Sequence, residues 1–260
     1  MNSYFYRIWL PMQALNILCL SLVFIGSVKV SWGVVFVSWF LIGPIGTGVG
    51  FHRLFSHRQF ETTRPLEIML AVLGTLTAYA PVLFWAAIHQ QHHRISDTKE
   101  DISSPKIYGF WQSFLYYRLR KDTLNKIHVR NDCVVKILKD PFLLWISTNF
   151  TLIIWIVYLG TACMSLQLLV SCLVLPSLIE HTRTNIISSL SHLNVPFSYR
   201  NFATNDSSQN NFILGFLSFG FAWHNNHHYD PGALCLTHKW WELDIEGLCA
   251  KLISKRPNLN

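Results

Sequence analysis

Long apolar stretches alternate with polar and basic segments along this chain. The apolar stretches cover residues 9–28, 32–51, 66–88 and 142–179. A helix needs about 20 apolar residues to cross a bilayer. The last stretch is long enough for two such helices, with a break near residues 160–165. Only residues 29–31 separate the first two stretches, so these are predicted to form a tight helical hairpin.

The stretch 66–88 is predicted not to cross the membrane. Pro81 interrupts it and Glu67 adds a charge. If it stays on one side, all of the 21 lysines and arginines except Lys29 lie on that same side. The positive-inside rule identifies that side as cytoplasmic. If the stretch crossed, the basic loop 94–140 would move to the opposite side and the asymmetry would be weakened.

We therefore predict an all-α integral membrane protein that forms a single domain over residues 1–260. Its four transmembrane helices are expected to form two hairpins, with spans at about 9–28, 32–51, 142–160 and 165–182. Residues 52–141 and 183–260 are expected to form a helical cap on the cytoplasmic face. Within the cap, residues 107–120 mix aromatic side chains with arginine, which is typical of a helix at the membrane interface.

Composition and charge agree with a membrane location. Hydrophobic residues make up 51% of the chain and charged residues only 13%, whereas a soluble domain is about 25% charged. In so apolar a chain, the net charge of +7 is more typical of contact with anionic membrane lipids than of nucleic-acid binding, so no nucleic-acid partner is expected. The 6 cysteines form no Cys-x-x-Cys pair, which argues against a zinc knuckle or a dithiol motif.

Three clusters contain most of the 12 histidines, and the predicted topology places all three on the cytoplasmic side. They are His52-Arg-Leu-Phe-Ser-His57, His89-Gln-Gln-His92-His93 and His224-Asn-Asn-His227-His228. Positions i, i+3 and i+4 share one face of a helix, so each of the last two clusters directs three imidazoles the same way. The first pair is five residues apart and converges only if its helix ends or bends, which Gly46, Gly48 and Gly50 would allow.

This pattern indicates a site for two metal ions. Imidazole is the commonest metal ligand in proteins, and eight box histidines exceed the four ligands that satisfy one zinc ion. The absence of His-Glu-x-x-His argues against a zinc protease. The absence of Glu-x-x-His argues against a carboxylate-rich di-iron bundle. His128, alone in a basic loop, is expected to be an ordinary surface residue.

The three boxes, in this order and around two membrane hairpins, resemble those of the integral-membrane fatty acyl desaturases of the stearoyl (delta-9) type. The resemblance runs from the second span to the C-terminus. It includes Gly50-Phe-His-Arg-Leu-Phe-Ser-His57, Phe84-Trp-Ala-Ala-Ile-His89, Ser96-Asp-Thr-Lys-Glu-Asp101 with Ser104-Pro105, Trp223-His-Asn-Asn-His-His228 and Trp240-Trp-Glu-Leu-Asp244.

The resemblance implies an enzyme with two iron ions (Fe²⁺) that uses oxygen to introduce a cis double bond into a fatty acyl chain. An unactivated methylene carries neither charge nor an acidic proton, so acid or base catalysis by side chains could not begin that reaction. The electrons would come from ferredoxin or cytochrome b5, because the chain shows no haem or flavin domain. Such donors are small and acidic and would dock on the basic cytoplasmic face.

A ninth histidine completes the site in that family, in an Asn-x-x-x-His pattern whose asparagine holds a water. The match here is Ser188-Ser-Leu-Ser-His192, in which Ser188 replaces the asparagine, and Asn185 is a second candidate for that role. His181 lies three helical turns from His192, about 16 Å, so both cannot serve one compact site, and His192 is favoured. The implied metal ligands are His52, His57, His89, His92, His93, His192, His224, His227 and His228.

Three acidic residues are candidates for holding the imidazole N–H groups from outside, namely Asp101, Glu242 and Asp244. For Glu242 and Asp244 the alternative is an ordinary solvated carboxylate.

The head group of the acyl substrate is open to lipid, carrier protein or coenzyme A. The acyl-CoA enzymes of animals place Arg-Asp before the second box, and Ala87 and Ile88 stand there instead, which favours lipid-linked or carrier-linked chains. The usual Gly-Glu-Gly before the last box is replaced by Gly220-Phe-Ala-Trp223.

Two other functions remain open. One is an acyl hydroxylase or acetylenase that uses the same irons. The other is a non-catalytic metal-binding protein of the membrane, which is disfavoured because the histidine clusters lie outside the predicted spans.

Overall fold

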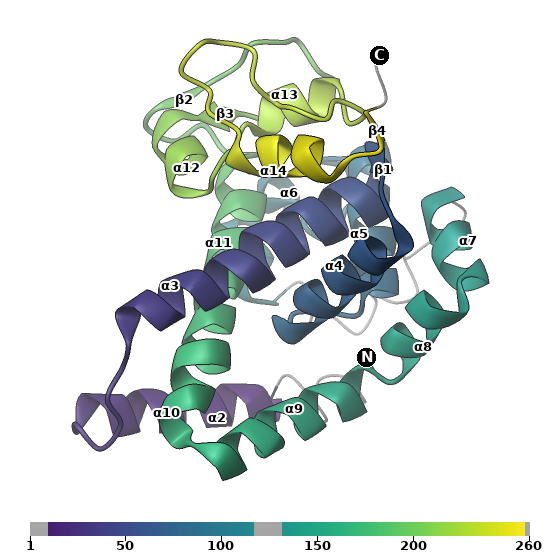
Figure 1. Cartoon of the computed structure of the whole chain (residues 1–260). Coiled ribbons are helices and arrows are strands. Elements are labelled where there is room, and N and C mark those ends of the chain that lie inside the picture. The colour runs from purple at the N-terminus through teal and green to yellow at the C-terminus, as the bar shows by residue number, and fades with distance from the viewer. Residues whose placement is uncertain (1–9, 117–131, 258–260) are drawn as a thin grey trace.

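The computed structural model describes residues 10–116 and 132–257, which form a mostly helical protein (Figure 1). His128 and the end of the predicted 107–120 helix lie outside these residues. The helices described are α2 (Leu10–Phe24), α3 (Trp32–Phe40), η2 (Leu41–Ser56), α4 (Arg64–Leu76), α5 (Val82–Ile95), α6 (Pro105–Tyr108), η3 (Gln112–Tyr116), α7 (Asp132–Lys139), α8 (Pro141–Thr148), α9 (Phe150–Met164), α10 (Leu166–Leu169), η6 (Val170–Val174), α11 (Leu175–Leu190), α12 (Phe212–Leu217), α13 (His224–Tyr229) and α14 (Ile245–Ile253).

Two short antiparallel ladders complete the fold. Strand β1 (Phe60–Glu61) pairs with β4 (Arg256–Pro257), so the C-terminal segment is tied to the residues that follow η2. Strand β2 (Ser198–Tyr199) pairs with β3 (Asn210–Asn211) and closes the loop between α11 and α12.

Helices α3 and η2 run on without a break from Trp32 to Ser56, and among the described residues only this helix is long and apolar enough by itself to cross a membrane. The pair α8 and α9 would be a second candidate, but it is bent by 67° at Asn149. Helix α2 has 15 residues, fewer than the roughly 20 a span needs. The mostly helical class is therefore confirmed, whereas four transmembrane helices are not.

The predicted 66–88 helix consists of two helices, α4 and α5, separated by residues 77–81. Pro81 is the N-cap of α5 and has an extended backbone, as expected of a residue that cannot donate a helical hydrogen bond and that disfavours helix in the residue before it. The break redirects α5, which carries the second histidine box. The predicted 107–120 helix is also interrupted, since α6 ends before Gly109 at φ 81° and η3 begins at Gln112.

Glycines let η2 and α4 approach each other closely. A Cβ on Gly46 would lie 2.4 Å from the backbone nitrogen of Gly74, and a Cβ on Gly74 would lie 2.4 Å from the ring of Phe51. This contact is of the kind expected when small residues line a helix interface. The core formed here includes Leu70 and Trp85 and supports the end of η2 from which the first histidine box projects.

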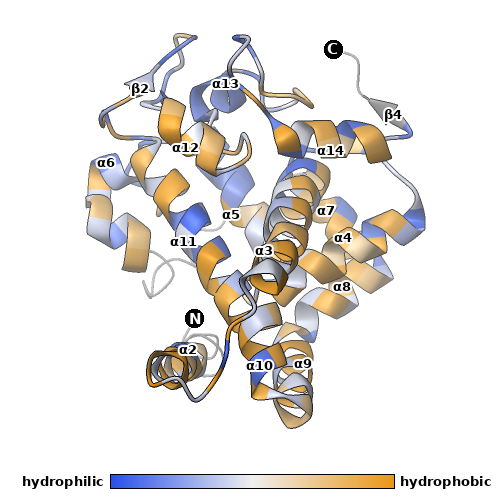
Figure 2. Ribbon diagram, turned by 60° about the vertical axis from the view of Figure 1, so that its left-hand side comes forward, coloured by the Kyte–Doolittle hydropathy of each residue, from blue (hydrophilic) through white to orange (hydrophobic). Residues whose placement is uncertain are grey.

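One end of the molecule has an apolar exterior, formed by α2, α9 and the start of α3 (Figure 2). Phe24 and Met164 are 92% and 78% exposed, and Ile17, Trp32 and Ile156 are also exposed. Apolar surface of this extent marks contact with a membrane or another protein. The loops around α13 and β2 lie at the opposite end and are more hydrophilic.

Candidate metal centre

The first histidine box is brought together by π-helical winding. In a π-helix each N–H bonds to the carbonyl five residues earlier, so positions i and i+5 share a face. η2 has this geometry, and the backbone N–H of His57 donates to the carbonyl of His52 at 3.1 Å. The two ring centroids are 5.0 Å apart. Their convergence was expected from a bend or helix end, but it results from the wider winding.

The other histidines come from three further elements. His89, His92 and His93 lie on the last turns of α5, and His224, His227 and His228 lie on α13. His192 lies two residues after the end of α11, next to the C-cap Ser191. The two H-x-x-H-H boxes are helical, as their spacing predicts.

The nine imidazoles form two groups. In the first, one nitrogen from each of His52, His57, His89 and His227 lies within 4.8 Å of the others. The Nε2 atom of His93 lies 3.2 Å from that of His89 and 2.9 Å from that of His227, so this histidine adjoins the first group.

The second group has four members, His92, His192, His224 and His228, whose ligand atoms also lie within 4.8 Å of one another. The Nε2 atom of His192 lies 3.1 Å from that of His92 and 3.0 Å from that of His224. The rings of His93 and His228 are 4.3 Å apart between centroids, so the two groups are neighbours.

Both groups suit metal ions. With imidazole–metal bonds of about 2.0–2.1 Å, ligand nitrogens on opposite sides of one ion are about 4 Å apart, which the observed spacing allows. The Nε2 atom of His228 is buried and has no hydrogen-bond partner among the described residues, as expected of a nitrogen directed at a metal. Nitrogen-only donor sets suit iron, zinc, copper and nickel, so the residues present fit the two irons that the resemblance implies.

Burial keeps most of these imidazoles neutral and able to donate a lone pair. Burial, together with nearby His228, lowers the pKa of His57 to about 3. Burial also lowers the pKa of His228 to about 4, even though its hydrogen bond to Asp206 acts in the opposite direction. His92 differs, because its contact with Asp101 outweighs burial and raises its pKa.

Three aspartates hold the second group from outside. The Nδ1 atom of His228 donates to Asp206 at 2.6 Å, and that of His92 donates to Asp101 at 2.9 Å. The Nδ1 atom of His192 donates to Asp97 at 3.2 Å. A carboxylate on Nδ1 fixes the tautomer that leaves Nε2 free for a metal. These contacts with His92, His192 and His228 lower the pKa of all three aspartates.

Asp101 was expected in this role, whereas the other two aspartates were not. Asp97 lies in the same Ser96–Asp101 motif as Asp101, and this shared motif was the only sequence feature that could have indicated its role. Asp206 lies in the polar loop between β2 and β3, and nothing in its local pattern distinguishes it. The first group is different, because the Nδ1 atoms of His52 and His227 are buried and have no partner among the described residues.

Glu242 and Asp244 do not contact the box imidazoles, and both are buried rather than solvated. Glu242 accepts from the amide of Asn226 at 2.9 Å and so holds α13 from behind. Asp244 binds the guanidinium of Arg53 through both carboxylate oxygens, at 2.8 and 2.9 Å. These two acids therefore fix the third box and the end of η2 rather than the ring nitrogens.

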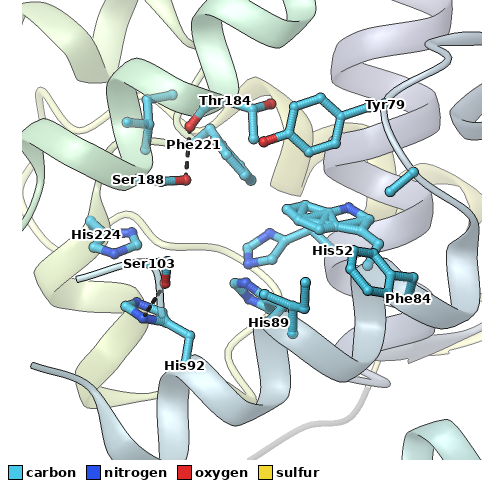
Figure 3. Close-up of a pocket in the computed structure, with 14 residues that line it drawn as sticks. His52, Tyr79, Phe84, His89, His92, Ser103, Thr184, Ser188, Phe221 and His224 are labelled. Atoms are coloured by element: carbon cyan, nitrogen blue, oxygen red, sulfur yellow. Dashed lines mark hydrogen bonds between the residues drawn. The ribbon is translucent and has the colours of Figure 1, made fainter. Parts of the chain in front are cut away.

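A cavity of about 50 Å³ adjoins both groups (Figure 3). His52 and His89 of the first group and His92 and His224 of the second line it, and the remaining wall is largely apolar, with Phe84, Trp85, Ile88, Ile187 and Phe221 among its residues. The two histidine groups thus adjoin a largely apolar space.

Ser188 lines this cavity and donates its hydroxyl hydrogen to the carbonyl of Thr184 at 2.8 Å. Asn185 is engaged elsewhere, because its side-chain oxygen accepts from the hydroxyl of Tyr79 at 2.7 Å. The ring nitrogen Nε2 of His181 lies 2.8 Å from the carbonyl oxygen of Thr77 and is therefore in a structural contact away from the two groups.

Comparison with known proteins gives one family. A model of the fatty acid desaturase family matches residues 30–245. Similar proteins include a hex-5-enoyl-[acyl-carrier protein] acetylenase of Moorena producens, 28% identical over 86% of this chain and 73% of the relative. An sn-2 palmitoyl-lipid 9-desaturase of Nostoc is 28% identical, over 86% of this chain and 81% of the relative. An sn-1 stearoyl-lipid 9-desaturase of Synechocystis is 30% identical, over 86% of this chain and 70% of the relative.

Proposed function

We propose that this chain, which belongs to the fatty acid desaturase family, forms a cis double bond in a fatty acyl chain with oxygen as the oxidant. The observation that carries the proposal is the convergence of nine imidazoles in two adjoining groups, four of which line one apolar cavity. A cavity beside the metals that is walled by aromatic and aliphatic side chains suits a substrate whose reacting part is a row of methylenes.

The nine imidazoles are the proposed ligands of two irons, five in the first group and four in the second. Bound iron would supply the oxygen-dependent removal of hydrogen from two adjacent methylenes, which no side chain can perform. The protein contributes placement and the exclusion of water. Phe84, Trp85 and Ile187 hold the acyl chain against the histidines, and the lone pairs of the Ser188 hydroxyl accept from a water beside His224.

The acyl chain is proposed to be linked to a lipid or to a carrier protein. The two residues just before the second box are apolar: Ile88 lines the cavity, and Ala87 is buried. Neither offers a charge that could bind a nucleotide-bearing head group such as coenzyme A. Among the relatives, some are named for palmitoyl-lipid, stearoyl-lipid or acyl-carrier-protein substrates and others for acyl-CoA substrates. The choice of lipid or carrier protein therefore rests on these two uncharged residues.

A second candidate product is a triple bond. This candidate is supported by the acetylenase relative, whose sequence identity to this chain, 28%, equals that of the palmitoyl-lipid desaturase. The histidine groups would be the same, because the outcome depends on how the chain lies against the metals rather than on the ligand set. A hydroxylated product belongs to the same class.

The enzyme is proposed to be a multi-pass membrane protein with its histidines on the cytoplasmic face. The apolar exterior of α2 and α9 supports insertion, and the charge asymmetry of the sequence supports the orientation. Residues 1–260 would act as one domain, with the four spans given above and the cap over them. Ferredoxin or cytochrome b5 is the proposed electron donor, attracted by the net charge of +7.

Fatty acid analysis of cells that express the chain tests the proposal. Gas chromatography–mass spectrometry is expected to find a new cis-unsaturated acyl species. A hydroxylated or triple-bonded species without any new alkene would replace the desaturase with the second candidate. A loss of product in both His192→Ala and His128→Ala would show that His192 has been wrongly chosen as the ninth ligand, since His128→Ala is expected to be neutral.

A further inference from the structure

We propose that the apolar groove between α3, α11 and α12 admits the acyl chain of a membrane lipid to the metal centre, past a gate formed by Ile187 and Phe221. This inference rests on the proposed function and adds to it the route and the kind of substrate. Figures 1 and 2 both draw α12 next to α11, at the end of the molecule that carries α13.

The groove has the chemistry of an acyl-chain site. Its volume is about 360 Å³, and its wall is mainly apolar, formed by Trp39, Leu178, Ile179, Ile186, Leu214 and Leu217. Its one charged side chain, Arg183, is only 6% exposed and binds Glu180 and Glu246 at 2.8 and 2.7 Å. The described wall therefore offers no free cation for the phosphates of a soluble carrier.

The outer edge of the groove is built to contact lipid. Helix α12 has no charged residue, and four of its five large apolar side chains are exposed, Leu217 by 68%. These four are Phe212, Ile213, Phe216 and Leu217, and the fifth, Leu214, lines the groove. A contiguous apolar surface of this kind is rare on a face that meets water. In the interface region of a bilayer, the same surface would place the mouth of the groove among lipid acyl chains.

A single layer of side chains separates the groove from the metal-centre cavity. Ile187 lines both spaces. Phe221 packs beside it, with its ring centroid 4.9 Å from that of His52 and 4.7 Å from the guanidinium carbon of Arg183. Both gate residues are apolar, so they can move aside for a hydrocarbon chain without leaving a charge unpaired.

Photo-crosslinking in phosphatidylcholine vesicles tests the groove directly. The probe is a phosphatidylcholine with a diazirine on its sn-1 acyl chain, used with the full-length, iron-loaded protein. Peptides that contain Ile186 or Leu214 are expected to carry the adduct. Adducts confined to α2 and α9, the general lipid-facing surface, would overturn the proposal.

A groove-filling variant, Ile186→Trp, is compared with Ile156→Trp, the same change at an exposed site on α9. Ile186 lines the groove but not the metal-centre cavity. Ile186→Trp is expected to lower both the groove adducts and the oxidation of lipid-linked chains by roughly tenfold, the effect of displacing about two buried methylenes. The control should match the wild type. If Ile186→Trp shows the same adducts and the same activity as the wild type, the proposed route through the groove is refuted.

Two further observations separate the possible failures. A variant that binds less iron than the wild type is identified as misfolded. If Ile186→Trp misfolds, the smaller change Ile186→Phe and the positions of the adducts in the wild type still test whether the groove admits lipid. If the wild type makes no oxidised lipid but carries adducts in the groove, the proposed function fails and the groove is supported as a lipid site. If the wild type makes unsaturated lipid and the groove carries no adduct, the groove alone is wrong.

Discussion

Asp206→Asn is expected to weaken one of the two metal sites and leave the other intact. The carboxylate of Asp206 accepts from His228 Nδ1 at 2.6 Å, the shortest of the three aspartate–histidine contacts in the second group. Asparagine retains an acceptor for the loop contacts of Asp206 with Thr204 and Ser208. It removes the negative charge that makes the imidazole of His228 a stronger ligand.

The size of the effect follows from the role of the carboxylate. Loss of such a partner typically lowers metal affinity by about 10- to 100-fold, or about 1.4–2.7 kcal/mol. No aspartate contacts an imidazole of the first group among the hydrogen bonds of the described residues, so its ion should be unaffected. The assay is iron content after dialysis against increasing concentrations of a chelator, where Asp206→Asn should lose one ion early and one at the wild-type concentration.

Asp230→Asn is the matched control, because Asp230 is exposed, lies two residues from His228 and bonds to its own loop at Gly232. It should release iron as the wild type does. The reasoning is refuted if Asp206→Asn and Asp230→Asn retain iron equally well, or if Asp206→Asn loses both ions together.

Three further predictions concern buried charge, close packing and the ninth ligand. Burial raises the pKa of Glu246 from 4.5 to about 7, although Arg183, at 2.7 Å, acts in the opposite direction. The stability that this proton provides is fully present below pH 4.5 and is lost as pH rises through 7. In thermal melts, the wild type should therefore lose stability relative to Glu246→Gln between those pH values, and a difference between the two that does not change with pH would contradict this. Gly46→Ala should lower the stability measured in thermal melts by about 1–3 kcal/mol, because the added Cβ meets backbone atoms. Gly33→Ala is the control and should leave the stability unchanged, since a Cβ there meets nothing within 4 Å. Equal melting temperatures for the two variants would be inconsistent with close packing at Gly46. His192→Ala should lose iron and His181→Ala should retain it when iron content is measured, and the reverse result would exchange their roles.

The sequence predicted those features that depend on local periodicity. The i, i+3, i+4 spacing correctly placed the second and third boxes on helices, and the mostly helical class followed from the apolar stretches. The nine histidines that were proposed as ligands lie together in the structure, since they share sequence motifs with a known family.

Features that depend on tertiary contacts were not foreseen. Five-residue spacing does not by itself indicate π-helical winding, so the geometry of the first box was expected to need a bend. The aspartate at position 206 reaches His228 only because the β2–β3 ladder folds the loop back over α13. Asn149 is one polar residue in an apolar run, and the 67° bend there was not predicted. Glu242 and Asp244 were expected either to hold imidazole N–H groups or to be ordinary solvated carboxylates. Both are instead buried and bind Asn226 and Arg53, contacts that no local sequence pattern indicates.

The central claim is that the two histidine groups bind the irons that oxidise an acyl chain. It is tested most directly by comparing wild-type protein with His227→Ala in the same cells, by iron content of the purified protein and by gas chromatography–mass spectrometry of the fatty acids. The wild type should carry two irons and produce a new unsaturated species, and His227→Ala should lose iron from the first group and produce none. A wild type that yields no oxidised acyl product when oxygen, iron and an electron donor are supplied, or a His227→Ala variant that yields as much as the wild type, would contradict the account.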